Sequence, residues 1–312
     1  MSLHVVVGAG PIGSAVATLL ADAGEEVRVV TRSGAGPVHP AIHRIAGDAS
    51  DRSRLRQLTQ GAVAIYNCAN PPYTRWLTDW PPLATSLLAA AEAADAVLAI
   101  TGNLYGYGPV SGPMTETTPL AATGRKGRVR AKMWHDAVAA HRAGRVRTFE
   151  VRAADYVGAG AASLFSSVLL PAMERNRTAW VPANVDLPHS FTYTGDVART
   201  LVALARDQRA WGRPWHVPSP PPITIRDLAQ RYFQIAGHPG VRITAVPRWV
   251  MRAAAPLVPM ARELAEMDYQ FYAPFILDSS ATTRTFGLTA TDLDVALREV
   301  ADGARATEAR RM

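Results

Sequence analysis

Residues 5–13 read Val5-Val6-Val7-Gly8-Ala9-Gly10-Pro11-Ile12-Gly13, an apolar run that passes directly into the glycine pattern G-x-G-x-x-G. Each glycine meets a physical need: Gly8 permits a tight turn, Gly10 lets a diphosphate approach the backbone, and Gly13 lets a helix pack on the strand. The free amides at the start of that helix carry partial positive charge, which favours phosphate groups. The pattern therefore predicts a strand, a turn and a helix that together hold a dinucleotide.

The next apolar run, Glu26–Val30, is followed by Thr31 and Arg32. Sites that select NAD usually place an acid here, where it binds the 2′-hydroxyl of the ribose, whereas this chain has Thr31. The guanidinium of Arg32 can instead form a bidentate pair with a 2′-phosphate. We therefore expect NADP(H) as the cofactor in preference to NAD(H), with Pro11 and Ile12 beside the glycines in contact with it.

Short apolar runs alternate with longer helical patterns through the first half of the chain, as the βαβ units of a parallel sheet require. The predicted strands are His4–Val7, Glu26–Val30, Val63–Asn67, Val97–Thr101 and Thr148–Arg152. The predicted helices between them are Ile12–Ala23, Ser53–Gln60, Leu83–Ala94 and Arg128–His141. The expected fold class is α/β, a Rossmann-type doubly wound parallel sheet.

The alternation of apolar runs and helical patterns ends after Arg152. From there, loops rich in glycine and proline separate isolated helical patterns. These helices are predicted at Ser163–Glu174, Val197–Arg206, Ile225–Ala236 and Asp292–Gly303. We expect a dinucleotide-binding domain at residues 1–158, to which residues 190–217 return. Residues 159–189 and 218–312 are expected to form a smaller C-terminal substrate-binding lobe.

The composition restricts the classes of function. Basic residues outnumber acidic ones, which gives a net charge of +7. The basic residues are scattered and are not interleaved with aromatic residues that could stack on bases, so nucleic acid is not an expected partner. Cys68 is the only cysteine and the histidines lack metal-ligand spacing, so no metal site is expected. No apolar run reaches the roughly 18 residues of a membrane span, and no signal peptide is evident, so we expect a cytoplasmic protein.

Four further motifs follow the glycine turn along the chain, and their order is informative. They are Gly47-Asp48-Ala49, Cys68-Ala69-Asn70, the segment from Ile100 to Gly106, and the segment from Phe191 to Val197. Together with the glycine turn they resemble the extended or atypical short-chain dehydrogenase/reductase family, which includes nucleotide-sugar epimerases and dehydratases. The resemblance implies cofactor contacts at Asp48, Ala49, Cys68, Ala69 and Asn70. It also implies that Thr101 takes the place of the family's catalytic Ser/Thr.

The central pair of that family is Tyr-x-x-x-Lys on one helix, in which the lysine lowers the pKa of the phenol and binds the nicotinamide ribose. The segment Arg128-Val129-Arg130-Ala131-Lys132 is similar to it at the lysine and lacks the tyrosine. Lys132 is one of only two lysines in the chain, so we assign it the catalytic and ribose-binding role. A guanidinium stays protonated, so Arg128 cannot supply the missing proton.

Three explanations for the missing tyrosine stay open. Tyr105 or Tyr107, which follow Thr101 closely, could donate the proton, although for each of them taken singly packing is the favoured role. Arg128 could bind an anionic group of the substrate. Alternatively, redox turnover has been lost.

Substrate residues are expected after the ends of the strands, because ligands of open α/β sheets bind at the carboxyl edge. The candidates are Asn103, Tyr73 and Trp76 (with Trp80 nearby), Asp155 (followed by Tyr156) and His189. The aromatic residues suit a planar or ring-bearing substrate, or they cap the core. His189 is either an acid or base or a structural residue.

These observations predict an NAD(P)(H)-dependent oxidoreductase or epimerase-like enzyme that acts on a small organic carbonyl or alcohol. One alternative is a non-catalytic NADP(H)-binding sensor or partner-binding protein. Another is an isomerase or cyclase that uses the cofactor without net redox change. The expected partner is a small-molecule substrate, and the family resemblance suggests a homodimer.

Overall fold

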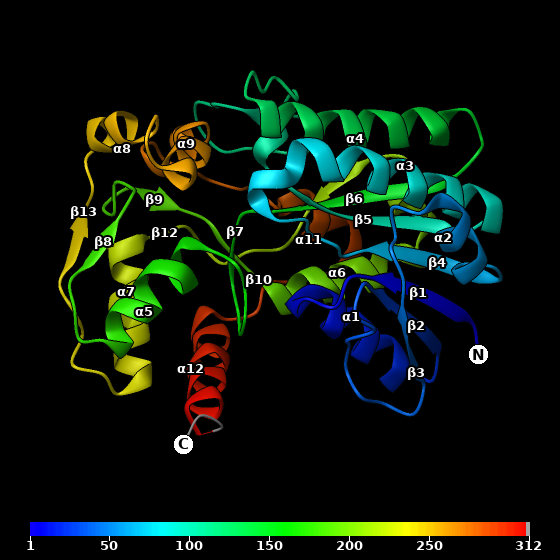
Figure 1. Ribbon diagram of the computed structural model, residues 1–312, viewed down its shortest axis with the longest axis horizontal. Coiled ribbons are helices and arrows are strands. Elements are labelled where there is room, and N and C mark those ends of the chain that lie inside the picture. The colour runs from blue at the N-terminus through cyan, green and yellow to red at the C-terminus, as the bar shows by residue number, and fades with distance from the viewer. Residues whose placement is uncertain (310–312) are drawn as a thin grey trace.

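A parallel sheet of seven strands forms the centre of the structure, a computed structural model that describes residues 1–309 (Figure 1). The strand order is β11-β6-β5-β4-β1-β2-β3. The strands are β1 (Leu3–Val7), β2 (Glu26–Thr31), β3 (Ile42–Ala46), β4 (Ala62–Asn67), β5 (Val97–Asn103), β6 (Arg147–Ala153) and β11 (Pro214–His216). Because the order reverses between β1 and β4, a crevice opens at their carboxyl ends, as in other doubly wound sheets. The predicted fold class is confirmed.

Two strands of this sheet, β3 and β11, were not predicted from the sequence. In β3 only Ile42 is buried, because the strand lies at the edge of the sheet, so its residues lack an apolar pattern. The short strand β11 pairs with β6 in the register Trp215 to Val151, far from it along the chain. Both strands are therefore specified by tertiary pairing and not by local periodicity.

Helices cover both faces of the sheet (Figure 1). On one face lie α1 (Pro11–Asp22) and α6 (Thr194–Ala205), which share an apolar core containing Val16, Leu20 and Leu201. On the other face lie α2 (Arg52–Leu58), α3 (Trp76–Ala94) and α4 (Arg125–Arg142), whose core includes Leu87 and Trp134. The short helices η1 (Tyr73–Arg75), η2 (Tyr105–Tyr107), η4 (Gln208–Ala210) and α11 (Ser280–Phe286) connect these layers.

Helix α3 begins at Trp76, seven residues before the predicted start at Leu83. The prediction stopped at Pro81 and Pro82, since proline normally breaks a helix interior. Here both prolines are exposed and lie in the first turns, while Trp76 and Trp80 are buried on the opposite side. Burial of two indole rings stabilises this extension by several kcal/mol, on the order of the cost of the missing backbone bonds.

A third apolar core, which contains Phe165, Leu228, Phe233 and Leu297, holds the remaining elements together. The helical elements are the π-helical segment η3 (Phe165–Leu169), α5 (Leu170–Glu174), α7 (Ile225–Ala236), α8 (Arg248–Ala254), α9 (Pro259–Ala265), α10 (Asp268–Phe271) and α12 (Leu293–Ala309). The strands pair as β7 (Asp155–Val157) with β10 (Phe191–Tyr193), β8 (Ala179–Val181) with β13 (Ile243–Ala245), and β9 (Pro188–His189) with β12 (Ile223–Thr224).

The ends of α7 match their sequence signals. Thr224 caps the first turn by accepting a hydrogen bond from the backbone N–H of Asp227, and Gly237 ends the helix with φ +67°. Residues 310–312 of the expected lobe lie outside the described residues. Among residues 1–309, no helix is long and apolar enough to cross a membrane.

Candidate active site

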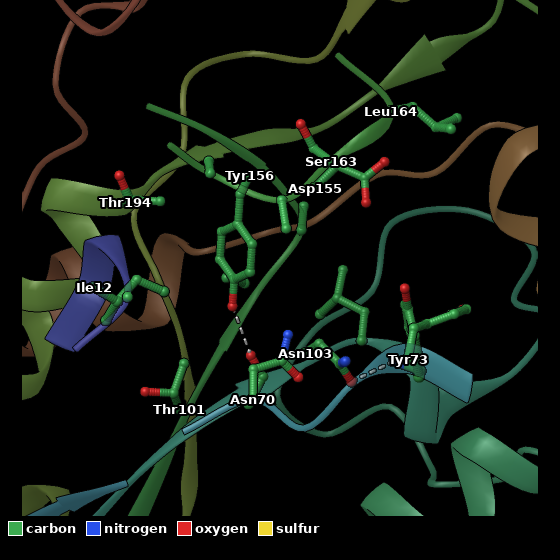
Figure 2. Close-up of a pocket in the computed structure, with 18 of the residues that line it drawn as sticks. Ile12, Asn70, Tyr73, Thr101, Asn103, Asp155, Tyr156, Ser163, Leu164 and Thr194 are labelled. Atoms are coloured by element: carbon green, nitrogen blue, oxygen red, sulfur yellow. Dashed lines mark hydrogen bonds between the residues drawn. The ribbon is translucent and has the colours of Figure 1, made fainter. Parts of the chain in front are cut away.

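A cavity of about 640 Å³ lies at the carboxyl ends of β1, β4, β5 and β6. Here the sheet meets the elements that pack around the core of Phe165, Leu228, Phe233 and Leu297. On the sheet side it is lined by the start of α1, by the loop after β4, and by the end of β5. On the other side it is lined by residues 160–164, Ser167, Met260, Leu264, Gln270, Phe271 and Phe275. In the view of Figure 2, Ile12 and Thr101 lie on one side of this space, and Tyr73 and Leu164 lie on the other.

The glycine turn is shaped by two backbone constraints and one open space. Gly8 has φ +98°, and a Cβ atom there would lie 2.7 Å from the backbone of Ala69. A Cβ atom at Gly13 would lie 2.0 Å from the carbonyl oxygen of Gly8. At Gly10, which lines the cavity, an added Cβ meets nothing within 4 Å. This open cradle against the N-terminus of α1 fits the diphosphate of a dinucleotide.

The residues expected near the adenosine lie at the ends of β2 and β3. Thr31 Oγ1 donates to the carbonyl of Ala35 at 2.9 Å, and the neighbouring Arg32 is exposed. Asp48 accepts hydrogen bonds from the hydroxyl and the N–H of Ser50, which lower the pKa of its carboxyl, and the charge of Arg32 lowers it further. Ala49 packs against the core. The loops after β2 and β3 thus place one cation, Arg32, and one carboxylate, Asp48, at this end of the sheet.

Thr101 and Cys68 meet in the cavity wall. Thr101 Oγ1 donates to Cys68 Sγ at 3.8 Å, and burial raises the pKa of the thiol to about 12. Cys68 is therefore a neutral thiol at physiological pH. It lines the cavity together with Ala69 and Asn70, as expected for the loop after β4.

Lys132 does not reach this cavity. Its side chain is 74% exposed and its ammonium pairs with Asp136 at 2.8 Å. Arg128, one turn earlier, is also exposed and donates to the carbonyl of Thr123. The expected placement of Lys132 at the ribose and of Arg128 at the substrate is corrected: both residues lie on the solvent-facing side of α4.

Arg130 is the residue of α4 that lines the cavity. Two positions from Lys132 correspond to about 200° around a helix, so Arg130 lies on the opposite side. It is 5% exposed, and its Nη2 donates to the carbonyl of Thr101 at 2.6 Å. Its guanidinium lies 4.8 Å from the ring centre of Trp80 and 3.9 Å from a Glu150 oxygen. Burial lowers the pKa of Arg130, but a guanidinium keeps its proton at neutral pH.

Tyr107 is buried outside the cavity, so its expected catalytic placement is also corrected. Its hydroxyl lies 2.7 Å from His216 Nε2 and 2.8 Å from Arg152 Nη1. Nδ1 of His216 faces the carbonyl of Asp278 and so donates to it, which leaves Nε2 to accept the phenol proton. Burial lowers the pKa of His216 to about 4, so the ring stays neutral in this network.

We expect Tyr107→Phe to lower the free energy of unfolding by about 1–3 kcal/mol, because the substitution leaves His216 Nε2 buried without a donor. Catalytic rate should stay at the wild-type value, since Tyr107 does not line the cavity. Urea denaturation measures the first quantity and steady-state kinetics the second. A large loss of rate in a stably folded variant would return Tyr107 to the active site.

Tyr105 and Tyr156 do line the cavity, as does Tyr73. Tyr105 lies 5.6 Å from Trp76 between ring centres, and burial raises its pKa well above the ordinary value. Tyr156, on β7, directs its hydroxyl toward the end of β5 and donates to the carbonyl of Gly102 at 3.4 Å (Figure 2). Burial raises the pKa of Tyr156 to about 12, and the charge of Arg130 opposes that rise.

Asp155 is held in the cavity wall by two partners. His189 Nε2 lies 2.9 Å from Asp155 Oδ2, and Gln270 donates to the other oxygen at 2.5 Å. His189 itself is 3% exposed and stacks on Phe275, and it does not line the cavity. The expected substrate contact of His189 is corrected to an indirect position behind Asp155.

The loop after β4 contributes the expected aromatic residues. Tyr73, Trp76 and Trp80 all line the cavity, in edge-to-face contacts of 5.1 Å between the first two rings and 6.1 Å between the last two. They also pack on the core, as the core-cap interpretation requires, and their contact with a ring-bearing substrate stays a prediction. Asn103 lines the cavity as expected, and its Oδ1 accepts from the N–H of Tyr105 at 3.2 Å.

The sequence did not predict most of the far wall, which is the side of the cavity opposite the sheet. Ser163, Leu164 and Ser167 reach the cavity from the segment around η3, and Leu264 reaches it from α9. Their side chains carry no motif, and only the tertiary fold brings them to the strand ends. Arg130 could have been found from the burial pattern of α4, whose apolar positions Ala131, Trp134 and Val138 mark the inward side.

The family model described as the NAD dependent epimerase/dehydratase family matches residues 4–217. No curated protein sequence matches the chain significantly. Solved structures that share the fold over nearly the whole chain are 15–19% identical in the three cases below, a level that supports the fold alone.

The first is the enzyme WbmH of Bordetella bronchiseptica in complex with NAD+, with 18% identity, a TM-score of 0.76, and 98% of each chain covered. The second is a UDP-glucose 4-epimerase of Thermotoga maritima with UDP-glucose, with 15% identity, a TM-score of 0.80, and 99% of this chain and 100% of that chain covered. The third is DesIV, a dTDP-glucose 4,6-dehydratase of Streptomyces venezuelae with NAD bound, with 19% identity, a TM-score of 0.79, and 99% and 98% covered.

Proposed function

Because the chain belongs to the NAD-dependent epimerase/dehydratase family, we propose that it is an NAD(P)(H)-dependent oxidoreductase or epimerase-like enzyme that acts on a small organic carbonyl or alcohol. The observation that carries this proposal is the convergence of Thr101, Tyr156 and Arg130 on one cavity, which the glycine turn also borders. No tyrosine precedes a lysine by four positions on α4, so Tyr156 and Arg130 replace the usual pair in this proposal, and Thr101 keeps the Ser/Thr position.

The dinucleotide would lie across Gly8–Gly13 with its diphosphate over Gly10, and Cys68, Ala69 and Asn70 would lie along it. Asp48 would contact the adenosine end. When bound, a nicotinamide supplies or accepts a hydride at the substrate carbon. The contribution of the chain is to fix the reacting carbon and oxygen beside Thr101 and to control the proton there.

The proposed chemistry places the substrate oxygen between Thr101 and Tyr156. A carbonyl oxygen that gains negative charge would accept a hydrogen bond from Thr101 Oγ1 and a proton from the Tyr156 phenol. The guanidinium of Arg130 would stabilise the resulting phenolate until it regains a proton from solvent. In the reverse direction the phenolate takes the alcohol proton. Arg130 thus supplies the charge that was expected from Lys132.

A library of carbonyl compounds offered with NADPH or NADH tests the proposal directly. We expect Tyr156→Phe to lower kcat by about 100-fold or more, because the proton donor is removed, while the Kd of the dinucleotide is unchanged. Tyr107→Phe is the matched control, since its hydroxyl lies outside the cavity. If Tyr105→Phe loses the rate instead, the donor is Tyr105. Binding of a dinucleotide without any turnover would favour the sensor or partner-binding function.

We propose NADP(H) as the preferred cofactor, although WbmH and DesIV hold NAD in their structures. The proposal is supported by an exposed Arg32 and by the absence of an acid at Thr31. Arg32→Ala should reduce the preference for NADPH over NADH by roughly tenfold or more, the value of a charge-assisted pair with the 2′-phosphate.

Fluorescence titration with both nucleotides measures that preference. Arg54→Ala is the control, because Arg54 is an exposed arginine of α2 whose Nη1 donates to Gln57 Oε1 at 3.5 Å. Equal affinities for NADPH and NADH in the wild type would remove the NADP(H) assignment.

A further inference from the structure

Few charged side chains line the cavity. Among the lining residues that the structure describes, Arg130 and Asp155 are the only charged ones. Arg130 lies beside Glu150 and donates to the carbonyl of Thr101, and Asp155 is bound by His189 and Gln270. In the proposed chemistry the charge of Arg130 already serves Tyr156, so no second cation of the described lining is left to neutralise a diphosphate.

The lysine nearest to the far wall is also neutralised. Lys126 is 2% exposed, and its ammonium contacts Glu263 and lies 3.7 Å from Glu266. It also lies 4.5 Å from the ring centre of Tyr73, behind the cavity wall. Because two carboxylates of the α9 region face one ammonium, this cluster repels a phosphate instead of binding it.

Beside Ser163, Ser167 and Gln270, the far wall presents apolar side chains. We define the apolar wall as Tyr73, Trp76, Leu164, Leu264, Phe271 and Phe275, which line the cavity from η1, α3, α9, α10 and the adjoining loops. Phe271 and Phe275 are 7% and 4% exposed, so they are part of a packed surface. Contact with this wall stabilises the binding of an apolar ring, because apolar surface is removed from water. The same contact does not offset the free-energy cost of desolvating a diphosphate.

We propose that the substrate is an uncharged, predominantly apolar compound that carries a ring and one alcohol or carbonyl oxygen, and that it is not a nucleoside-diphosphate sugar. This inference rests on the proposed function, because it assigns the apolar wall to the substrate and the glycine turn to the cofactor. The ring lies against the apolar wall, and the oxygen reaches Thr101 and Tyr156. Specificity then comes from apolar area and from the position of a single oxygen.

The test uses the full chain saturated with NADPH and measures binding of cyclohexanone, 1-tetralone and UDP-glucose by calorimetry. We expect 1-tetralone to bind about tenfold or more tightly than cyclohexanone, because its second ring buries additional apolar surface. UDP-glucose at millimolar concentration should neither bind nor displace 1-tetralone. Competition by UDP-glucose, or equal binding of the two ketones, would overturn the proposal.

Leu264→Arg sharpens the test, since it places a cation in the apolar wall. Affinity for 1-tetralone should fall by tenfold or more, while the Kd for NADPH stays unchanged. Leu257→Arg is the matched control, because Leu257 is 85% exposed and does not line the cavity. Unchanged affinity in folded Leu264→Arg would contradict the assigned wall. A ketone that binds without being reduced would refute the proposed function alone, and turnover of a charged substrate would refute this inference alone.

Discussion

Arg130→Met should lower kcat/KM by about 100-fold or more, the range expected when charge stabilisation is removed from a buried site. The guanidinium is 5% exposed and lies between the carbonyl of Thr101 and the ring of Trp80. Methionine fills a similar volume without the charge. Glu150 keeps Arg152 as a partner at 2.7 Å, so the variant should still fold. Steady-state kinetics and thermal denaturation measure the two quantities.

Lys132→Met is the matched control from the same helix. Its ammonium is exposed and pairs only with Asp136 on that helix, so kcat/KM should equal the wild-type value. Arg130→Lys should recover part of the activity, because it restores the charge but not the planar geometry of the guanidinium. The opposite result, with activity lost in Lys132→Met and retained in Arg130→Met, would restore the mapping expected from the sequence.

Gly10→Val should weaken dinucleotide binding by about 100-fold or more, because the side chain occupies the space where two or more hydrogen bonds to phosphate would form. The stability of the fold should change little. An added Cβ meets nothing within 4 Å, and the backbone at Gly10 has φ −69° and ψ −175°, which any residue adopts. Fluorescence titration with NADPH measures the affinity.

Gly13→Ala provides the contrast to this variant. Its Cβ would lie 2.0 Å from the carbonyl oxygen of Gly8, so we expect a clear fall in melting temperature as well as in affinity. If Gly10→Val binds NADPH as tightly as the wild type, the diphosphate does not lie over Gly10, and the cofactor assignment fails.

The features that were predictable from the sequence are those encoded by neighbouring residues. The glycine turn, the interior strands and the cap at Thr224 depend on local spacing and local chemistry, and the structure contains each of them. The parallel sheet followed from the alternation of strands and helices. The loop after β4 reached the cavity because every parallel strand ends at the same edge.

The features that were not predictable depend on distant contacts. The match to Tyr-x-x-x-Lys and the rarity of lysine in this chain indicate Lys132, but the phase of α4 is set by burial of Ala131, Trp134 and Val138. Arg130 therefore faces inward. Arginine is common in this chain, so residue frequency did not single out Arg130. The partners of Tyr107 and His189 come from β11 and β7, so their burial had no local signal.

The late return of β11 to the sheet bears on how the protein is made. Residues 154–213 must leave the ribosome before Pro214–His216 can pair with β6. Until then the outer edge of β6 is open to other chains, and Tyr107 lacks its His216 partner. A nascent or truncated chain that stops after β6 is therefore the species that we expect to aggregate or to need a chaperone.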